Sequence, residues 1–204
     1  MAKAPTPGEV KTRLCPPCTP DEAAAIARAA LCDTLAAALA CDTPVVLALA
    51  GPEGPWLPPG VDVVAQIDGT FNERLAAAWA HLPCGGVQIG MDTPQVDAQL
   101  LSRALAAVEK SGAALGPATD GGWWLLGLDH PYPAMFDGIT MSTASTGRQQ
   151  FARLRELGFT PQLLPTLTDI DTWLTACAVA GSIAGSRTAA AVGHVAGRLR
   201  ARDE

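Results

Sequence analysis

One carboxylate follows a short apolar run at a place where α/β proteins bind ligands. Asp92 lies in the segment Gly-Val-Gln-Ile-Gly-Met-Asp-Thr-Pro-Gln, residues 86–95. Val87 and Ile89 alternate with Gln88, which predicts a strand that the following glycine and proline end. Ligands of open α/β sheets bind beyond the carboxyl ends of the strands. We therefore predict that Asp92 binds a hard cation, Mg²⁺ or Mn²⁺; the alternative is that it caps a turn.

A basic, proline-rich segment near the N-terminus offers groups for an anion. Lys3, Lys11 and Arg13 fall within thirteen residues that hold one acidic residue, Glu9, and Gly8 frees the backbone between them. Side chains two apart in an extended chain point to the same side, so Lys11 and Arg13 are expected to converge. An ammonium and a guanidinium fork suit a diphosphate. The alternative is a solvated basic loop, and the spacing is not that of a Walker loop.

A third segment combines a carboxylate, two glycines and two aromatic side chains. Asp120 precedes Gly121 and Gly122, which would let a ligand or a second backbone approach closely. Trp123 and Trp124 must point to opposite faces if they lie in a strand. One of them would then stack on a base or sugar while the other packs in the core, unless both are core residues.

Hydroxyl and carboxyl groups recur in two later segments. Ser142 and Thr143 belong to a hydroxyl-rich run that ends at Arg148, and this run either caps a helix or binds sugar hydroxyls and a phosphate. Asp169 and Asp171 share one side of an extended chain. Either of them would join the metal site, or one of them caps the helix that follows.

The composition limits the classes of protein to which the chain can belong. It has 204 residues, of which 49% are hydrophobic and 17% charged, as expected for a single globular domain over residues 1–204. The net charge of −6 argues against a nucleic-acid-binding surface. We expect a soluble cytoplasmic protein without a membrane span, because the sequence has no signal peptide and no apolar run of eighteen residues. Its six cysteines would be reduced thiols, and Cys15-Pro-Pro-Cys18 lacks the partners of a zinc or redox site.

Helical and strand patterns alternate along the chain. Thr19, Pro20 and Glu22 predict a capped helix start. The alternation predicts an α/β fold with a mostly parallel sheet and helices on both faces. The expected helices lie near 20–40, 71–81, 97–111, 147–157, 172–180 and 187–201, and the expected strands near 44–50, 61–65, 87–89, 113–116, 122–128 and 162–164.

Five motifs resemble a poorly characterised bacterial family of the GT-A superfamily, whose members are described as glycosyltransferases of the nucleotide-diphospho-sugar transferase fold. The superfamily also holds molybdenum-cofactor and 2-phospho-L-lactate guanylyltransferases. The resemblance implies a divalent metal at Asp92, phosphates near Lys11 and Arg13, and a contribution from Asp120 or Asp171. The motifs are Lys3-Ala-Pro-x-Pro-Gly-x-Val-Lys11-Thr-Arg13-Leu, Ile89-Gly-x-Asp92-Thr-Pro-Gln, Gly116-Pro-Ala-x-Asp120-Gly-Gly-x-Trp-Leu-Leu-Gly-Leu, Met141-Ser-Thr-x-x-Thr-Gly and Asp169-x-Asp171-Thr.

The expected function is metal-dependent transfer of a sugar from a nucleoside diphosphate sugar to a small-molecule acceptor. Asp120 would orient or deprotonate the acceptor, and Asp171 would assist at the metal or in catalysis. A nucleotidyltransferase that attacks the α-phosphate of a nucleoside triphosphate is the second hypothesis, although its first loop would be rich in glycine. The third is a non-catalytic nucleotide-binding module. The oligomeric state stays open.

The resemblance also predicts that the first strand is largely missing, because the phosphate motif begins at Lys3 and relatives carry an apolar run upstream. We expect at most three residues of this strand and a gap or distortion beside the strand at 45–50. Poor solubility is expected to follow, and an apolar extension in frame is expected to raise the melting temperature.

Overall fold

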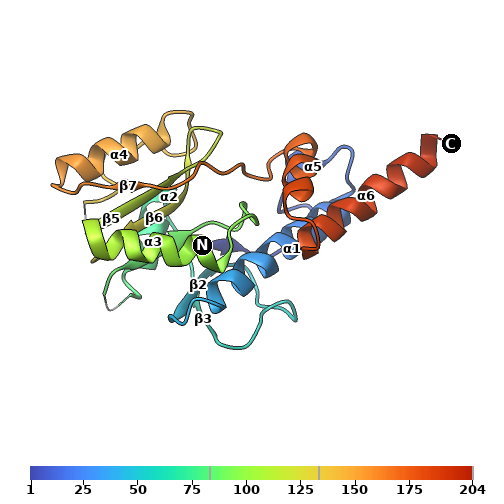
Figure 1. Cartoon of the computed structure of the whole chain (residues 1–204). Coiled ribbons are helices and arrows are strands. Elements are labelled where there is room, and N and C mark those ends of the chain that lie inside the picture. The colour runs from blue at the N-terminus through green and yellow to red at the C-terminus, as the bar shows by residue number, and fades with distance from the viewer. Residues whose placement is uncertain (83, 133, 204) are drawn as a thin grey trace.

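The computed structural model describes residues 1–82, 84–132 and 134–203 and has the predicted alternation of helices and strands (Figure 1). Each expected helix and strand is present close to its expected bounds. The elements are β1 (Ala2–Lys3), the 3-10 helix η1 (Thr12–Leu14), α1 (Pro20–Leu39), β2 (Val45–Ala50), β3 (Val61–Ala65), α2 (Phe71–Trp79), β4 (Gly86–Ile89), α3 (Ala98–Ser111), β5 (Ala113–Pro117), β6 (Trp123–Leu128), α4 (Thr146–Glu156), β7 (Gln162–Leu163), α5 (Trp173–Ser182) and α6 (Arg187–Asp203).

The strands form two sheets. The first has the order β1-β2-β3 and is parallel throughout, and the second has the order β4-β6-β5-β7. In the second sheet β6 runs antiparallel to both β4 and β5, whereas β5 and β7 are parallel. The α/β class is confirmed, but the expectation of parallel strands does not extend to β6. The reason is the short loop 118–122 between β5 and β6, since a parallel connection needs a crossover of a dozen or more residues.

The two sheets meet at β1. Ala2 and Lys3 pair with Leu49 and Ala50, at the carboxyl end of β2, and the backbone nitrogen of Met1 donates to the carbonyl of Ile89 over 3.0 Å. β1 therefore lies between β2 and β4. Its two residues agree with the expected maximum of three, and the earlier part of β2 has no strand on that side among the described residues, as the predicted gap requires.

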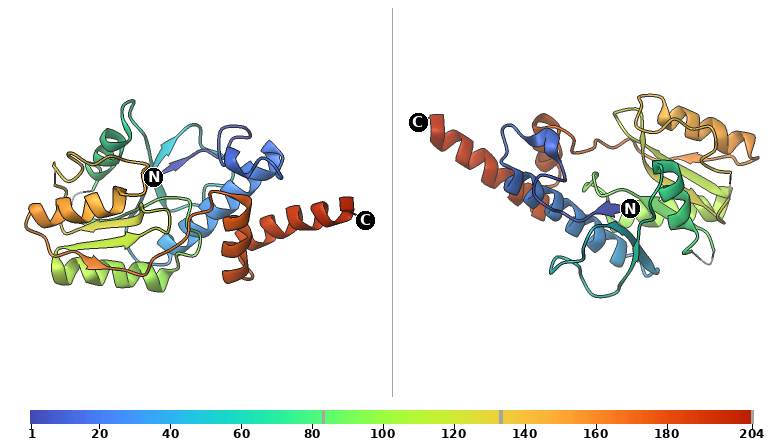
Figure 2. Two further views of the ribbon diagram at one scale, coloured as in Figure 1. Left: turned by 90° about the horizontal axis from the view of Figure 1, so that it is seen from above. Right: turned by 180° about the vertical axis from the view of Figure 1, so that it is seen from behind.

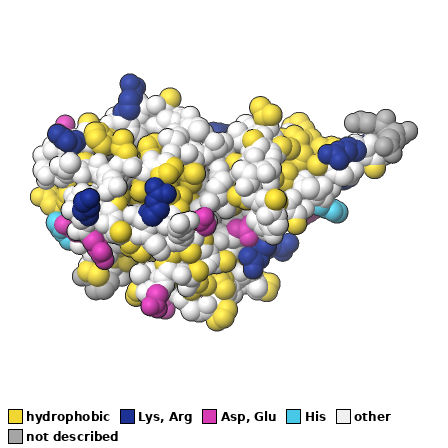
Figure 3. Space-filling view, viewed as in Figure 1, with side chains coloured by type: hydrophobic (Ala, Val, Ile, Leu, Met, Phe, Trp, Pro, Cys, Tyr) yellow, Lys and Arg dark blue, Asp and Glu magenta, His cyan; other side chains and the backbone are white. Residues whose placement is uncertain are grey.

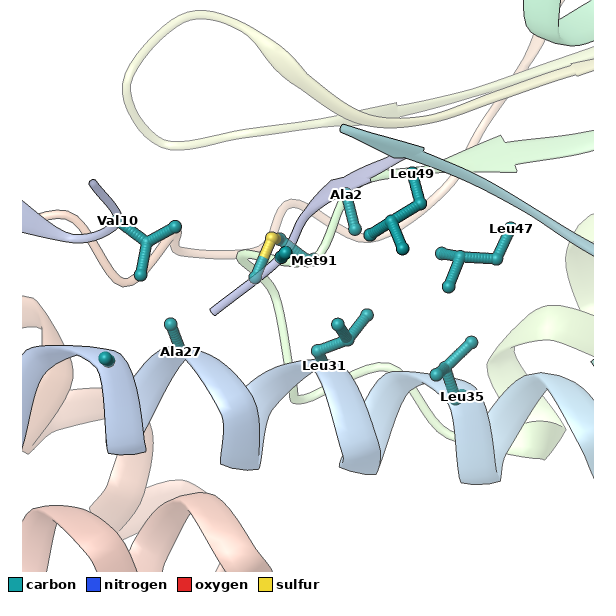
Figure 4. Packing of buried hydrophobic residues seen from close by; sticks show 10 residues of the cluster. Ala2, Val10, Ala27, Leu31, Leu35, Leu47, Leu49 and Met91 are labelled. Atoms are coloured by element: carbon teal, nitrogen blue, oxygen red, sulfur yellow. The ribbon is translucent and has the colours of Figure 1, made fainter. Parts of the chain in front are cut away.

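Helix α1 is buried on two sides, which explains its high alanine content. One side packs on β1 and β2, where Leu31 and Leu35 meet Leu47 and Leu49 (Figure 4). The other side contributes Ile26 to a cluster with α5 and α6. The predicted capping box at the start of α1 is present, with reciprocal hydrogen bonds between residues 19 and 22.

Helices cover both faces of the second sheet. α3 packs on one face through residues such as Leu101 and Val108, while α2 and α4 pack on the other through Leu75 and Leu154 (Figure 2). Gln88 points from β4 into the layer of α2, where its side chain donates to the carbonyl of Leu75 and accepts from the Trp79 indole. The oxygen and the nitrogen of this buried side chain therefore each have a hydrogen-bond partner on α2.

Helix α6 begins against α1 and then extends away from the sheets (Figures 1 and 2). The Lys and Arg side chains on the face in Figure 3 mostly lie apart from one another among hydrophobic and uncharged surface. Among the described residues, no helix has both the length and the apolar character needed to cross a membrane.

Candidate active site

A cavity of about 490 Å³ opens where β1 and β4 end. Its walls come from the N-terminal segment, the turn after β4, the loop between β5 and β6, the start of α2, and two later loops. It therefore lies at the carboxyl edge of the strands, as predicted. The predicted site residues that line it are Lys3, Lys11, Arg13, Asp92, Asp120, Gly122, Ser142 and Asp171.

The ammonium of Lys11 is the cation nearest to Asp92. Its Nζ lies 2.6 Å from Oδ1 of Asp92 and 3.8 Å from Oδ1 of Asp171, and it donates to the carbonyl of Ile170. The Lys11 side chain is only 8% exposed, whereas that of Asp92 is 44% exposed. Asp92 is thus held by a buried cation on one side and remains open to the cavity on the other.

Lys11 and Arg13 do not lie on an extended loop, so that prediction is wrong. Lys11 has φ 50°, in the left-handed region, and immediately precedes the 3-10 turn η1. This turn sends Lys11 inward and leaves Arg13 at the surface, 77% exposed, with Nη1 3.5 Å from Oδ2 of Asp171. Both cations still lie near Asp171, Lys11 at its Oδ1 and Arg13 at its Oδ2.

Two loops distant in sequence, which carry Asp92 and Asp171, are joined by hydrogen bonds. The backbone nitrogen of Ile170 donates to the carbonyl of Asp92 over 2.9 Å, and Nε2 of Gln95 donates to the carbonyl of Thr168 over 2.7 Å.

Asp171 does not cap α5, because the side chain of Thr172 holds that position. The alternative that one of the two aspartates caps this helix is therefore wrong.

Asp169 is a partly buried aspartate of the cavity wall whose pKa is raised. It lines the cavity with Asp92, Asp120 and Asp171. Burial, together with the negative charges of Asp120, Asp92 and Asp171, raises the pKa of Asp169 from 3.8 to about 7, against the opposing effect of Lys11. At Asp169, the repulsion by the neighbouring carboxylates therefore outweighs the attraction of Lys11.

The carboxylate oxygens are suitable ligands for a divalent cation, but these side chains alone do not complete its coordination. Within the part of the chain that the structure describes, no three His, Cys, Asp or Glu side chains are grouped closely enough to hold a metal ion. Mg²⁺ needs no such group, because it is usually bound by one or two carboxylates together with substrate phosphates and water. The side chains of Asp92 and Asp171 both flank the Lys11 ammonium, and because they are 44% and 38% exposed, their exposed oxygens are suitable for that role.

Asp120 is exposed in the cavity wall and is held in place by its own loop. Its Oδ1 accepts from the backbone nitrogen of Gly122 over 2.7 Å. Gly121 does not line the cavity. A Cβ at Gly121, which has φ +89°, would lie 2.2 Å from the carbonyl oxygen of Ala144. Gly121 therefore lets two loops pack together. Of the two expected alternatives, close approach of a ligand or of a second backbone, the structure shows the second.

Four predicted residues lie outside the lining of the cavity. They are Gly8, Gly121, Thr143 and Arg148. Thr143 is engaged with the side chains of Ser145 and Thr146, and Arg148 is exposed on α4.

The two tryptophans point to opposite faces of β6, as predicted for a strand. Trp124 is buried among residues of the α3 face, and its indole donates to the carbonyl of Pro165 over 3.0 Å. Trp123 is half-buried at the wall of the cavity and stacks on Phe136, with 6.4 Å between ring centroids.

Three lining residues at the start of α2 were not predicted. Gln66 follows β3, and Phe71 and Arg74 lie in the first turn of α2. The signal available in the sequence was their position after a predicted strand, because loops that follow parallel strands reach the same sheet edge.

Comparisons with known proteins agree with this fold. A comparison with curated proteins found no match. The structure is similar to that of a "putative nucleotide-diphospho-sugar transferase" from Desulfovibrio desulfuricans G20, with 26% identity and a TM-score of 0.86 over 97% of this chain and 94% of the other. It shares its fold with Rv0371c from Mycobacterium tuberculosis H37Rv, at 19% identity and TM-score 0.52 over 87% of this chain and 94% of the other. A manganese complex of Rv0371c matches at 22% identity and TM-score 0.51, over 76% and 86%.

A family model matches more than half of the chain. The model is described as "Uncharacterized protein conserved in bacteria (DUF2064)" and covers residues 24–143, which include β2 to β6 and the Asp92 turn. The structural likeness extends over the remaining elements. The chain therefore belongs to the bacterial DUF2064 family and has a nucleotide-diphospho-sugar transferase-like fold.

Proposed function

We propose that this protein is a metal-dependent glycosyltransferase that uses a nucleoside diphosphate sugar. The observation that carries the proposal is one cavity at the sheet edge in which aspartates and basic side chains from distant segments face the same space. A nucleoside diphosphate with its cation needs both kinds of group, namely oxygen ligands for the cation and donors for the phosphates. The likeness to a nucleotide-diphospho-sugar transferase supports the same assignment.

Each residue then has a distinct task. Asp92 and Asp171 hold Mg²⁺ or Mn²⁺, which offsets the charge that builds on the departing diphosphate. Arg13 is exposed and donates to the diphosphate, and Lys3, also exposed in the cavity wall, adds a second positive charge. Lys11 is buried against Asp92 and fixes its orientation.

Asp120 is placed to act on the acceptor. Its Oδ1 is held by a backbone nitrogen, while the side chain is exposed in the cavity wall. A carboxylate in this position orients an acceptor hydroxyl and accepts its proton as the sugar is transferred. Gly122 and Ser142, which also line the cavity, lie next to the space that the sugar would fill.

A thermal-shift panel of nucleotide sugars and nucleoside triphosphates, each with and without Mn²⁺, tests the proposal. A ligand at a hundred times its dissociation constant adds about 2.7 kcal/mol to the free energy of unfolding. For a chain of this size that shift raises the melting temperature by roughly 5–10 °C. We expect a nucleoside diphosphate sugar to give the largest shift and Mn²⁺ to be required for it.

The product separates the competing functions. Slow donor breakdown or sugar transfer releases a nucleoside diphosphate, whereas a nucleotidyltransferase releases pyrophosphate from a triphosphate. A shift with a nucleotide sugar and no turnover under any condition would identify a binding module. Absence of any Mn²⁺-dependent shift would contradict the proposal.

A further inference from the structure

Arg74 is a cavity-lining cation held only by neutral groups. Its Nη1 donates to Oε1 of Gln66 over 3.4 Å, and its guanidinium carbon lies 5.4 Å from the centroid of the Phe71 ring. Its Nε is buried, and no acceptor lies within reach of it among the described residues. The ion pairs in the described part of the chain do not include Arg74. Its full charge is therefore available to a ligand.

The partners of Arg74 are themselves fixed. Nε2 of Gln66 donates to the carbonyls of Ala2 and Ala48, over 2.8 and 2.9 Å, so both neighbouring strands hold this side chain. The oxygen of Gln66 must then face the guanidinium. Such an arrangement positions Arg74 without neutralising it, and a partly buried charge of this kind normally has a counter-charge.

Arg74 and Lys11 belong to parts of the cavity wall that adjoin different hydrophobic clusters. Lys11 and Arg13 adjoin the cluster of Leu14 and Ile170, which packs against α1, α5 and α6. The residues around Arg74 instead adjoin the cluster under α2, β5 and β6. We call this second region the α2 wall; it consists of Phe71, Arg74, Trp123 and Met141.

We propose that the α2 wall binds an anionic group, a carboxylate or a phosphate, on the acceptor. This inference rests on the proposed function, because that function places the donor diphosphate beside Arg13 and Asp92 and leaves the α2 wall to the second substrate. The Arg74 guanidinium binds two oxygens of the anion as a fork. Phe71 and Trp123 provide an apolar face for the carbon skeleton of the same molecule.

The test is an NMR titration with small anions and a neutral analogue. The probes are acetate, methyl phosphate and acetamide, which has the shape of acetate without its charge. They are added to ¹⁵N-labelled protein that is saturated with Mg²⁺, which is diamagnetic, and with the nucleoside diphosphate of the best nucleotide sugar from the panel above. The indole signal of Trp123 reports on the α2 wall, and that of Trp56, which packs against the cluster between α1 and β2 and is outside the cavity lining, serves as the internal reference.

Two variants are compared with the wild-type protein. Arg74→Gln removes the charge, and Arg103→Gln removes an exposed arginine on α3 outside the cavity as the matched control. We expect Arg74→Gln to weaken acetate and methyl phosphate binding at least about ten-fold, the size of a lost hydrogen bond to a charged group. Arg103→Gln leaves both affinities unchanged, acetamide does not bind, and the nucleotide affinity stays the same in both variants.

Three results would overturn the inference: equal anion binding by Arg74→Gln, acetamide binding as tightly as acetate, or an equal loss of nucleotide affinity, which would make Arg74 part of the donor site. If Arg74→Gln fails to fold, Arg74→Lys keeps a charge. Preference for acetate over acetamide in that variant supports the inference, and loss of the preference contradicts it.

Nucleotide binding tests the proposed function, and anion binding tests the α2 wall, so the two can fail separately. If no nucleoside diphosphate binds, that function fails and the acceptor assignment fails with it. The same titration on the free protein then decides whether the α2 wall is an anion site at all. Anion binding that Arg74→Gln removes would support the site, and unchanged binding would exclude it.

Discussion

At the scale of single residues, one buried cation, Lys11, contacts the carboxylates that line the cavity. The ammonium of Lys11 lies between Asp92, Asp171 and the carbonyl of Ile170. It compensates part of the negative charge and keeps Asp92 from rotating toward the core. Because Asp92 remains 44% exposed, a divalent cation can approach its free side without displacing Lys11.

Asp92→Asn keeps the size of the side chain and removes its charge. We expect the affinity for Mn²⁺ in the presence of nucleotide to fall by at least about 10–100-fold, the range seen when even an outer partner of a metal is lost. Isothermal titration measures it. Asp62→Asn, an exposed aspartate on β3, is the control and leaves the affinity unchanged. Wild-type Mn²⁺ binding by a folded Asp92→Asn protein would remove Asp92 from the site.

Arg13→Ala tests the contact with the diphosphate. Because the side chain is 77% exposed, we expect a loss of about 1.5 kcal/mol in binding of a nucleoside diphosphate, the lower end of the range for hydrogen bonds to charged groups. Binding of the nucleoside without phosphates should not change. Arg103→Ala is the matched variant outside the cavity. An equal loss for nucleoside and nucleoside diphosphate would show that the loop itself had been disturbed.

At the scale of elements, the cavity depends on tight contacts between loops. The loop 118–122 reverses the chain between β5 and β6, and the start of α4 packs directly on it. The nitrogen of Gly147 donates to the carbonyl of Gly121 over 2.8 Å, and Asp120 accepts from Gly122 within the same loop. Gly121 and Gly147 have no side chain, which allows these close backbone contacts, and the contacts set the positions of Asp120 and Ser142.

Gly121→Ala and Gly138→Ala separate steric contact from backbone strain. Both glycines have positive φ, +89° and +74°, but a Cβ at Gly121 would lie 2.2 Å from a backbone oxygen, whereas nothing lies within 4 Å of one at Gly138. Gly138→Ala is expected to cost about 1–2 kcal/mol of stability from its left-handed conformation. Gly121→Ala is expected to cost about 1–3 kcal/mol more from overpacking, and to weaken ligand binding. Chemical denaturation measures both, and equal losses would argue against the contact.

At the scale of the whole molecule, α6 is attached to α1 by polar contacts at its two ends. Asp33 of α1 accepts from the backbone nitrogen and hydroxyl of Thr188. Further along, Arg198 donates to both carboxylate oxygens of Glu22. These contacts connect the first and last helices and enclose the cluster that supports Lys11 and Ile170.

The pH dependence of stability tests the second contact. Hydrogen bonding from Arg198 lowers the pKa of Glu22 below its ordinary value of 4.5. A carboxylate with a lowered folded-state pKa adds stability above pH 4.5, and this contribution is lost as the pH falls through the folded-state pKa.

Glu22→Gln removes that contribution at every pH while keeping an acceptor for the capping box of α1. The melting temperature of the wild type should exceed that of Glu22→Gln above pH 4.5, and the two curves should approach each other in acid. Glu109→Gln, at an exposed position on α3, is the control and follows the wild type. A constant difference at all pH values would contradict the role of the ion pair.

The bounds of the helices and strands were predictable from the sequence because their signals are local. The capping box of α1 and the Asp97 cap of α3 act within four residues, and apolar periodicity is read within one element. The position of Asp92 after a strand was predictable for the same reason. Tertiary structure decided the rest, because it depends on contacts that span the chain. Lys11 faces inward since it meets Ile170, 159 positions away, and Gly121 is needed because Ala144 packs on it. Arg74 enters the cavity because α2 packs on the second sheet while Gln66 is held by the first. No pattern within one segment contains that information.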